Sequence, residues 1–140
     1  MKKTTGDLLK SLKSKATVDD YLTENSNELI FDTLPDWIEF HMIKKKLDKA
    51  DVVRASNITR TYAYQIINGD KKPSRDKLIM LCFGLRLTLD ETQQILRRTG
   101  YSELYPRDLR DSIIIFALLH GYSVVDLNIL LAEKNAAILE

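Results

Sequence analysis

The sequence has few residues that cross-link or interrupt a fold: its 140 residues include one cysteine, three prolines and five glycines. A single cysteine excludes an intramolecular disulfide, and Cys82 lies in the apolar run 78–83, where we expect a small core side chain. The scarcity of proline and glycine, together with 44% hydrophobic and 29% charged residues, excludes a fibrous or disordered chain. The length fits one compact domain with a short N-terminal extension.

The sequence also lacks long hydrophobic runs. Its most apolar stretch, 113–119, is far shorter than the roughly 20 residues that cross a bilayer, so we expect a buried helix there. The first 15 residues alternate lysine with leucine and form no continuous apolar segment of the kind a signal peptide requires. These features predict a cytoplasmic protein with no membrane partner.

The net charge is only +1, but its distribution along the chain is uneven. Residues 41–75 carry nine basic and three acidic side chains, whereas 1–40 carry five and eight, and 76–140 carry seven and nine. A basic band inside a near-neutral chain is typical of a surface that binds a polyanion such as nucleic acid. A solvated basic surface without a partner gives the same pattern, and charge alone does not separate the two.

The pattern of apolar residues and caps predicts an all-α fold with no strand. Most segments with apolar residues at helical spacing are preceded by Ser, Thr or Asp, whose side chains cap helix N-termini. Gly100 and Gly121 stand where helices end. The predicted helices are 5–14, a short one after Thr17, one from Thr33 to about 47, then 49–56, 60–67, 75–85, 89 to about 100, 106–120 and 124 to about 134.

The helix predicted at 60–67 has two distinct faces. Helical periodicity places Tyr62, Ala63, Ile66 and Ile67 on the core face, and leaves Arg60, Thr61, Tyr64 and Gln65 on the outer face. This outer face has a hydrogen-bonding group at each position and no carboxylate. Arginine reads guanine, glutamine reads adenine, and threonine meets a thymine methyl in a DNA major groove.

The segment before this helix has the spacing of a helix-turn-helix. Val52, Val53 and Ser56 are predicted to pack inward, with Val53 approaching Ala63 where the helices cross. Asn57 suits a left-handed turn position, and Ile58 is expected to fill the core before Thr59 caps the second helix.

Residues 37–96 resemble the phage-repressor-like (Cro/XRE-type) helix-turn-helix family. The resemblance rests on this spacing and on the motif NGDKKPS at 68–74, which is similar to the family's signature directly after the recognition helix. It implies a lambda-repressor-like five-helix DNA-binding domain. Two positions depart from the family pattern: Lys49 replaces a frequent Gln, and Asn57 replaces the usual turn glycine.

The resemblance and the helical faces together give a set of candidate DNA contacts. Base contacts are expected from Thr59, Arg60, Thr61, Tyr64 and Gln65, and phosphate contacts from Lys49, Asn68, Lys71 and Lys72. The two loop lysines, 71 and 72, could equally serve loop solubility. The run Lys44 to Lys46 is predicted to be the solvated end of a helix.

No catalytic, metal or cofactor site is predicted. The sequence has no phosphate-cradling glycine loop and no Gly-x-Ser-x-Gly elbow, and His41 and His120 have no cysteine or histidine partner at metal-ligand spacing. Trp37, Tyr101 and Tyr105 are predicted to be packing residues. We therefore expect no enzyme.

The sequence predicts a transcriptional regulator that binds double-stranded DNA as a homodimer, organised as an extension (1–32), a DNA-binding domain (33–100) and C-terminal helices (101–140) packed on that domain. The dimer surface is expected around 113–131, and the extension is a candidate site for a protein partner. The alternative is a protein-interaction adaptor or antitoxin-like subunit that keeps the same fold. The near-neutral charge and the extra helices favour this alternative.

Overall fold

The computed structural model describes residues 3–25 and 33–140, and throughout these residues the secondary structure is helical, with no strand. The chain divides into two compact units, Met1–Asp32 and Thr33–Glu140. In the first unit, α1 (Thr5–Ser14) and α2 (Val18–Glu24) are capped by Thr4 and Thr17, whose hydroxyls accept hydrogen bonds from the backbone N–H three residues later. The polar sequence at 24–28 predicts a linker, and beyond Asn25 this segment lies outside the described residues.

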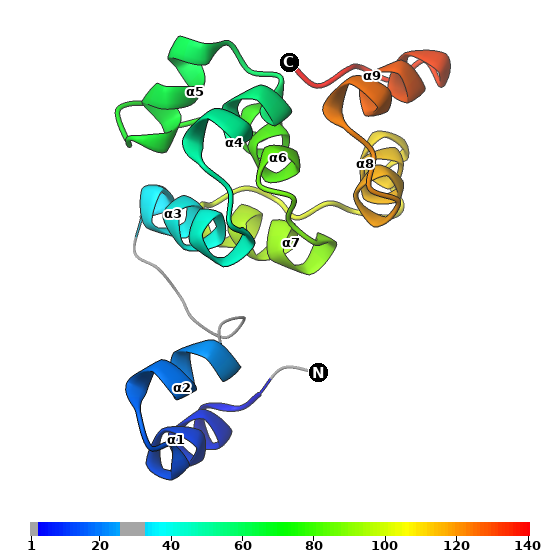
Figure 1. The fold of residues 1–140 in the computed structure, drawn as a ribbon. Coiled ribbons are helices and arrows are strands. Elements are labelled where there is room, and N and C mark those ends of the chain that lie inside the picture. The colour runs from blue at the N-terminus through cyan, green and yellow to red at the C-terminus, as the bar shows by residue number, and fades with distance from the viewer. Residues whose placement is uncertain (1–2, 26–32) are drawn as a thin grey trace. The chain divides into compact units, whose positions relative to one another are not determined.

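The second unit contains the remaining helices of the described chain (Figure 1). They are α3 (Leu34–Lys45), α4 (Lys49–Ser56), α5 (Arg60–Ile67), α6 (Arg75–Gly84), α7 (Leu89–Arg98), α8 (Leu109–Leu119) and α9 (Val124–Glu133). The all-α prediction is confirmed. The helix expected to reach residue 47 ends at Lys45, because Lys46 turns into the left-handed region with a φ of 57°.

Local capping chemistry explains most helix starts, with two corrections to the predictions. Thr59 occupies the N-cap position of α5, but its hydroxyl makes no capping hydrogen bond. Pro106 does not open α8, because it lies inside a turn closed by the Asp108 N–H donating to the Tyr105 carbonyl at 3.0 Å. The helix begins three residues later at Leu109, where the Asp108 carboxylate accepts from the Asp111 N–H at 2.8 Å.

The core of the second unit is centred on α6, which is buried from Leu78 through Gly84 and packs against α4. Gly84 allows the closest approach, since a Cβ added there would lie 2.7 Å from the Val52 carbonyl oxygen and 3.1 Å from the Ser56 Cβ. The predicted core positions Trp37 and Cys82 are 3% and 1% exposed. Burial also raises the pKa of the Cys82 thiol to about 12, so this side chain stays un-ionised.

A buried carboxylate joins α3 to α7. Glu91 is 8% exposed, and it accepts hydrogen bonds from Lys45 at 2.7 Å, from Lys44 at 3.3 Å and from the Thr88 N–H at 2.9 Å. The lysine run at 44–46 is predicted to be a solvated helix end; Lys44 is exposed but also binds Glu91, and the half-buried Lys45 corrects the prediction. Their ammonium groups bind a charge that would otherwise be buried without a partner.

Two reciprocal ion pairs fasten α8 to the first turn of α6. Arg75 binds the Asp111 carboxylate through two nitrogens at 3.1 and 3.2 Å, and Arg110 binds Asp76 at 2.8 and 3.0 Å. Each guanidinium also donates to two backbone carbonyls, those of Ser102 and Glu103 for Arg75, and those of Ala137 and Ile138 for Arg110. Bidentate charge-assisted pairs are strong and directional, so α8 is held in a defined position on α6.

Candidate nucleic-acid interface

The turn between α4 and α5 is built from three residues with distinct tasks. Asn57 adopts the left-handed conformation predicted for it, with a φ of 59° and a ψ of 22°. The Ser56 hydroxyl donates to the Val53 carbonyl at 2.8 Å and accepts from the Ile58 N–H at 3.3 Å. Ile58 is then buried at 6% exposure, while Asn57 and Thr59 remain exposed. The turn thereby fixes how α5 leaves α4.

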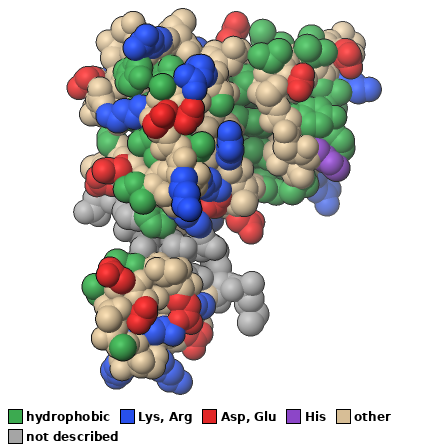
Figure 2. All heavy atoms as spheres, viewed as in Figure 1, with side chains coloured by type: hydrophobic (Ala, Val, Ile, Leu, Met, Phe, Trp, Pro, Cys, Tyr) green, Lys and Arg blue, Asp and Glu red, His purple; other side chains and the backbone are tan. Residues whose placement is uncertain are grey.

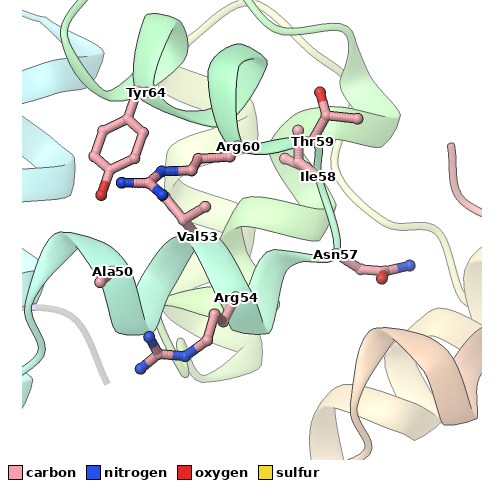
Figure 3. Close-up of a pocket in the computed structure, with 8 residues that line it drawn as sticks. All are labelled: Ala50, Val53, Arg54, Asn57, Ile58, Thr59, Arg60 and Tyr64. Atoms are coloured by element: carbon pink, nitrogen blue, oxygen red, sulfur yellow. The ribbon is translucent and has the colours of Figure 1, made fainter.

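The outer face of α5, defined as Thr59, Arg60, Thr61, Tyr64 and Gln65, is open to solvent at its N-terminal end. Thr59, Arg60 and Thr61 are exposed, and Tyr64 and Gln65 are half-buried. Figure 3 shows the Arg60 side chain extending toward the Tyr64 ring, and the guanidinium carbon lies 5.7 Å from the ring centroid. This distance is within the range of a cation–π contact between Arg60 and Tyr64.

A surface hollow of about 590 Å³ lies between α4 and α5 beside this face. Its lining comes from both helices and from the turn: Ala50, Val53, Arg54, Asn57, Ile58, Thr59, Arg60 and Tyr64 (Figure 3). Arg54 was not among the predicted contacts. The sequence could have indicated Arg54 only as a basic residue on the solvent side of α4. In the structure the Arg54 guanidinium forms an ion pair with Asp51 at 2.6 Å.

The predicted phosphate-binding residues fall into two groups. Lys49 and Asn68 are brought together from the start of α4 and the end of α5, with the Lys49 ammonium 3.4 Å from the Asn68 side-chain oxygen. Lys71 and Lys72 belong to the exposed loop after α5, but they lie over different rings, Tyr62 at 5.6 Å and Tyr101 at 5.5 Å. All four side chains are exposed.

The loop after α5 has a defined backbone. The Gln65 carbonyl accepts hydrogen bonds from the Asp70 N–H at 2.8 Å and the Lys71 N–H at 3.2 Å, and Gly69 supplies the positive φ of 85° that this turn needs. Both loop lysines therefore emerge from an ordered turn attached to the end of α5. Loop basic residues held in this way can follow a sugar-phosphate backbone.

Tyr62 is a correction to the predicted core face of α5. Ala63, Ile66 and Ile67 are buried as expected, but Tyr62 is half-buried. Two ammonium groups, those of Lys71 and Lys77, each lie 5.6 Å from the centroid of its ring. The ring thus supports basic side chains at the surface and does not fill the core.

Two absences in the described part of the chain concern metal-ligating clusters and membrane-spanning helices. Within residues 3–25 and 33–140, no group of three or more His, Cys, Asp or Glu side chains is placed to hold a metal ion. In the same described ranges, no helix combines the length and the apolar character needed to span a membrane.

Comparison with known proteins identifies no family for this chain. No protein-family model matches it, and neither a curated protein nor a solved structure matches it.

Proposed function

We propose that the protein is a sequence-specific regulator that binds double-stranded DNA through a Cro/XRE-type helix-turn-helix formed by α4 and α5. The observation that carries this proposal is the outer face of α5, which combines exposed Thr59, Arg60 and Thr61 with no carboxylate. A helix of this chemistry can enter a major groove without repelling phosphate, and its Arg, Thr and Gln side chains match the donor and acceptor pattern of base edges.

In this proposal the two sets of predicted contacts have separate tasks. Thr59, Arg60, Thr61, Tyr64 and Gln65 read bases. Lys49, Asn68, Lys71 and Lys72 bind phosphates on either side of α5 and fix its register on the duplex. Arg60 would leave its position over Tyr64 to donate to guanine O6 and N7, a short movement for an exposed side chain.

The protein acts in the cytoplasm as a homodimer, in line with the two-fold symmetry typical of this class of regulator. Two copies of α5 would then read half-sites about 34 Å apart on a palindromic operator. No cofactor or catalysis is required for this function, because recognition rests on side chains of the protein alone.

The test is selection of bound duplexes from a random pool with the full chain, followed by binding assays over a salt series. We expect a palindromic site whose affinity falls steeply with salt. Arg60→Ala should weaken that site by about 1–3 kcal/mol and relax one base position, whereas Lys72→Ala should weaken all duplexes alike. Arg98→Ala, an exposed arginine on α7, is the matched control and should leave binding unchanged.

Failure to select any duplex, or equal losses for Arg60→Ala and Arg98→Ala, would refute DNA recognition by α5. An adaptor or antitoxin-like subunit would show neither selection nor steep salt dependence. In that case the fold would serve a partner protein instead.

A further inference from the structure

From Ser112 to its end at Leu119, helix α8 has no charged side chain on any face, yet only part of this segment is buried in the core. From Ser112 to Val125 the chain runs for 14 residues without a lysine, arginine, aspartate or glutamate. Of the side chains in α8, Asp111, Ile114 and Ala117 are buried. A helix that is apolar all round normally has protein on both faces, and α8 has the core on one face only.

The solvent side of α8 carries a regular apolar stripe. Leu109 and Phe116 are seven residues apart, and Leu119 follows three residues later, so the three lie on one face. They are 65%, 43% and 64% exposed, although each is a large hydrophobic side chain. The spacing is that of helices that pack along one another.

The turn after α8 and the outer side of α9 extend this surface. The Phe116 ring lies 5.7 Å from the ring of Tyr122, which is 37% exposed, and α9 exposes Val125 at 53% and Ile129 at 54%. In Figure 2, apolar side chains gather over the part of the molecule that α8 and α9 form in Figure 1. We define the α8–α9 apolar surface as Leu109, Phe116, Leu119, Tyr122, Val125 and Ile129.

The size of this surface fits a stable protein interface. These side chains together expose on the order of 500 Å² of apolar area, near the upper end of the largest patch on an ordinary monomer. A standard interface buries about 800 Å² on each partner, of which somewhat more than half is apolar. The apolar part of such an interface is therefore already present on one copy of this chain.

We propose that the α8–α9 apolar surface is covered by the same surface of a second copy, forming a two-fold symmetric dimer. A phosphate backbone or a charged peptide would need several charges, whereas residues 112–125 carry none and Asp126 is the one exposed charge between Val125 and Ile129 on α9. A surface whose charges share one sign repels an identical surface, and a surface without charges avoids this repulsion. An isologous contact needs a self-complementary patch, and an uncharged apolar stripe satisfies this condition.

The biological role of this dimer rests on the proposed DNA-binding function, because a palindromic operator requires two copies of α5. The dimer itself does not depend on DNA. It can therefore be tested by sedimentation equilibrium of the full chain without nucleic acid, at micromolar concentrations, for the wild type and two variants.

Leu119→Asp places a charge in the stripe, and Ile43→Asp is the matched control, since Ile43 on α3 is 71% exposed and lies outside the surface. The wild type and Ile43→Asp should be dimers. Leu119→Asp should dissociate on the order of 100-fold more readily, because the substitution acts on both copies of a symmetric contact. Circular dichroism of both variants checks that the helices persist.

Three results would overturn the proposal: a wild type that is monomeric throughout, equal dissociation of the two variants, or a Leu119→Asp dimer as tight as the wild type. Binding to duplexes with one and two selected half-sites separates this proposal from the proposed function. If Leu119→Asp binds one half-site as the wild type does but no longer binds two half-sites more tightly than one, the dimer and the DNA-binding proposal both stand. If the wild type is a dimer that binds no duplex, the dimer stands and the DNA-binding proposal fails.

Discussion

His41 should make the second unit lose stability as the pH falls from 7 to 5. The side chain is 3% exposed on α3, with the Phe40 ring edge-on at 5.2 Å and the Trp37 ring stacked at 6.4 Å. Neither ring nitrogen makes a hydrogen bond within residues 3–25 and 33–140, although Nδ1 lies 3.4 Å from a Glu91 carboxylate oxygen. Burial lowers the pKa of His41 from 6.5 to about 4, opposed by the nearby Glu91 carboxylate and assisted by Lys45 and Lys44.

The sign of the effect follows from proton binding in the two states. Between pH 6.5 and 4 the unfolded chain binds a proton at His41 and the folded chain does not, so lowering the pH favours unfolding. For these pKa values the stability lost between pH 7 and pH 5 is about 2 kcal/mol. Glu91 adds little in this window, because hydrogen bonds and charges outweigh its burial and lower its pKa to about 2.

Urea unfolding at the two pH values, at constant ionic strength, measures this loss. Trp37 is the only tryptophan of the chain and lies beside His41 in the core, so its fluorescence reports on the second unit. His41→Leu should remove most of the pH dependence while filling the same buried site. His120→Gln, at an exposed histidine, is the control and should keep the wild-type dependence.

Two results would show that the reasoning about His41 is wrong. One is an unchanged pH dependence in His41→Leu. The other is an NMR titration of the folded protein in which the His41 ring protonates above pH 6, since a buried neutral ring cannot do so without unfolding.

Two further predictions concern backbone positions of the second unit. Gly84→Ala should lower the free energy of unfolding by roughly 1–3 kcal/mol, because its Cβ would lie 2.7 Å from the Val52 carbonyl oxygen. Gly6→Ala in α1, where the nearest atom is 3.8 Å away, is its control in urea unfolding followed by circular dichroism, since Trp37 does not report on the first unit; equal effects would contradict the packing argument. Asn57→Ala should cost about 1 kcal/mol or more at a φ of 59°, whereas Asn57→Gly should not; a stable Ala variant would show that the turn relaxes.

The helices were predictable because their start signals are local. An N-cap and its N–H partner are three residues apart, and Ser74 with Lys77 or Thr88 with Glu91 show this in sequence and structure alike. The same logic located the left-handed turn at Asn57. It misplaced the start of α8, because proline suits both the first turn of a helix and the second position of a β-turn.

Long-range electrostatics could not be predicted from the sequence. Glu91 lies 46 residues from Lys45, and Asp111 lies 36 residues from Arg75. Helical periodicity says which side of a helix a residue occupies, but not which distant element faces it. The outer face of α5 follows from periodicity alone, whereas the place of Arg54 in the same hollow as Arg60 depends on how the two helices cross.

The two ion pairs between α6 and α8 bear on both proposals together. A palindrome with fixed spacing is read only if each α5 is held rigidly relative to the dimer axis. α5 leads through a short loop into α6, and the first turn of α6 binds α8 through Arg75 with Asp111 and through Asp76 with Arg110. Bidentate pairs resist both sliding and rotation, which one salt bridge or an apolar contact alone would permit. The C-terminal helices are thus attached rigidly to α6. In the proposed dimer this attachment would keep the distance between the two copies of α5 constant.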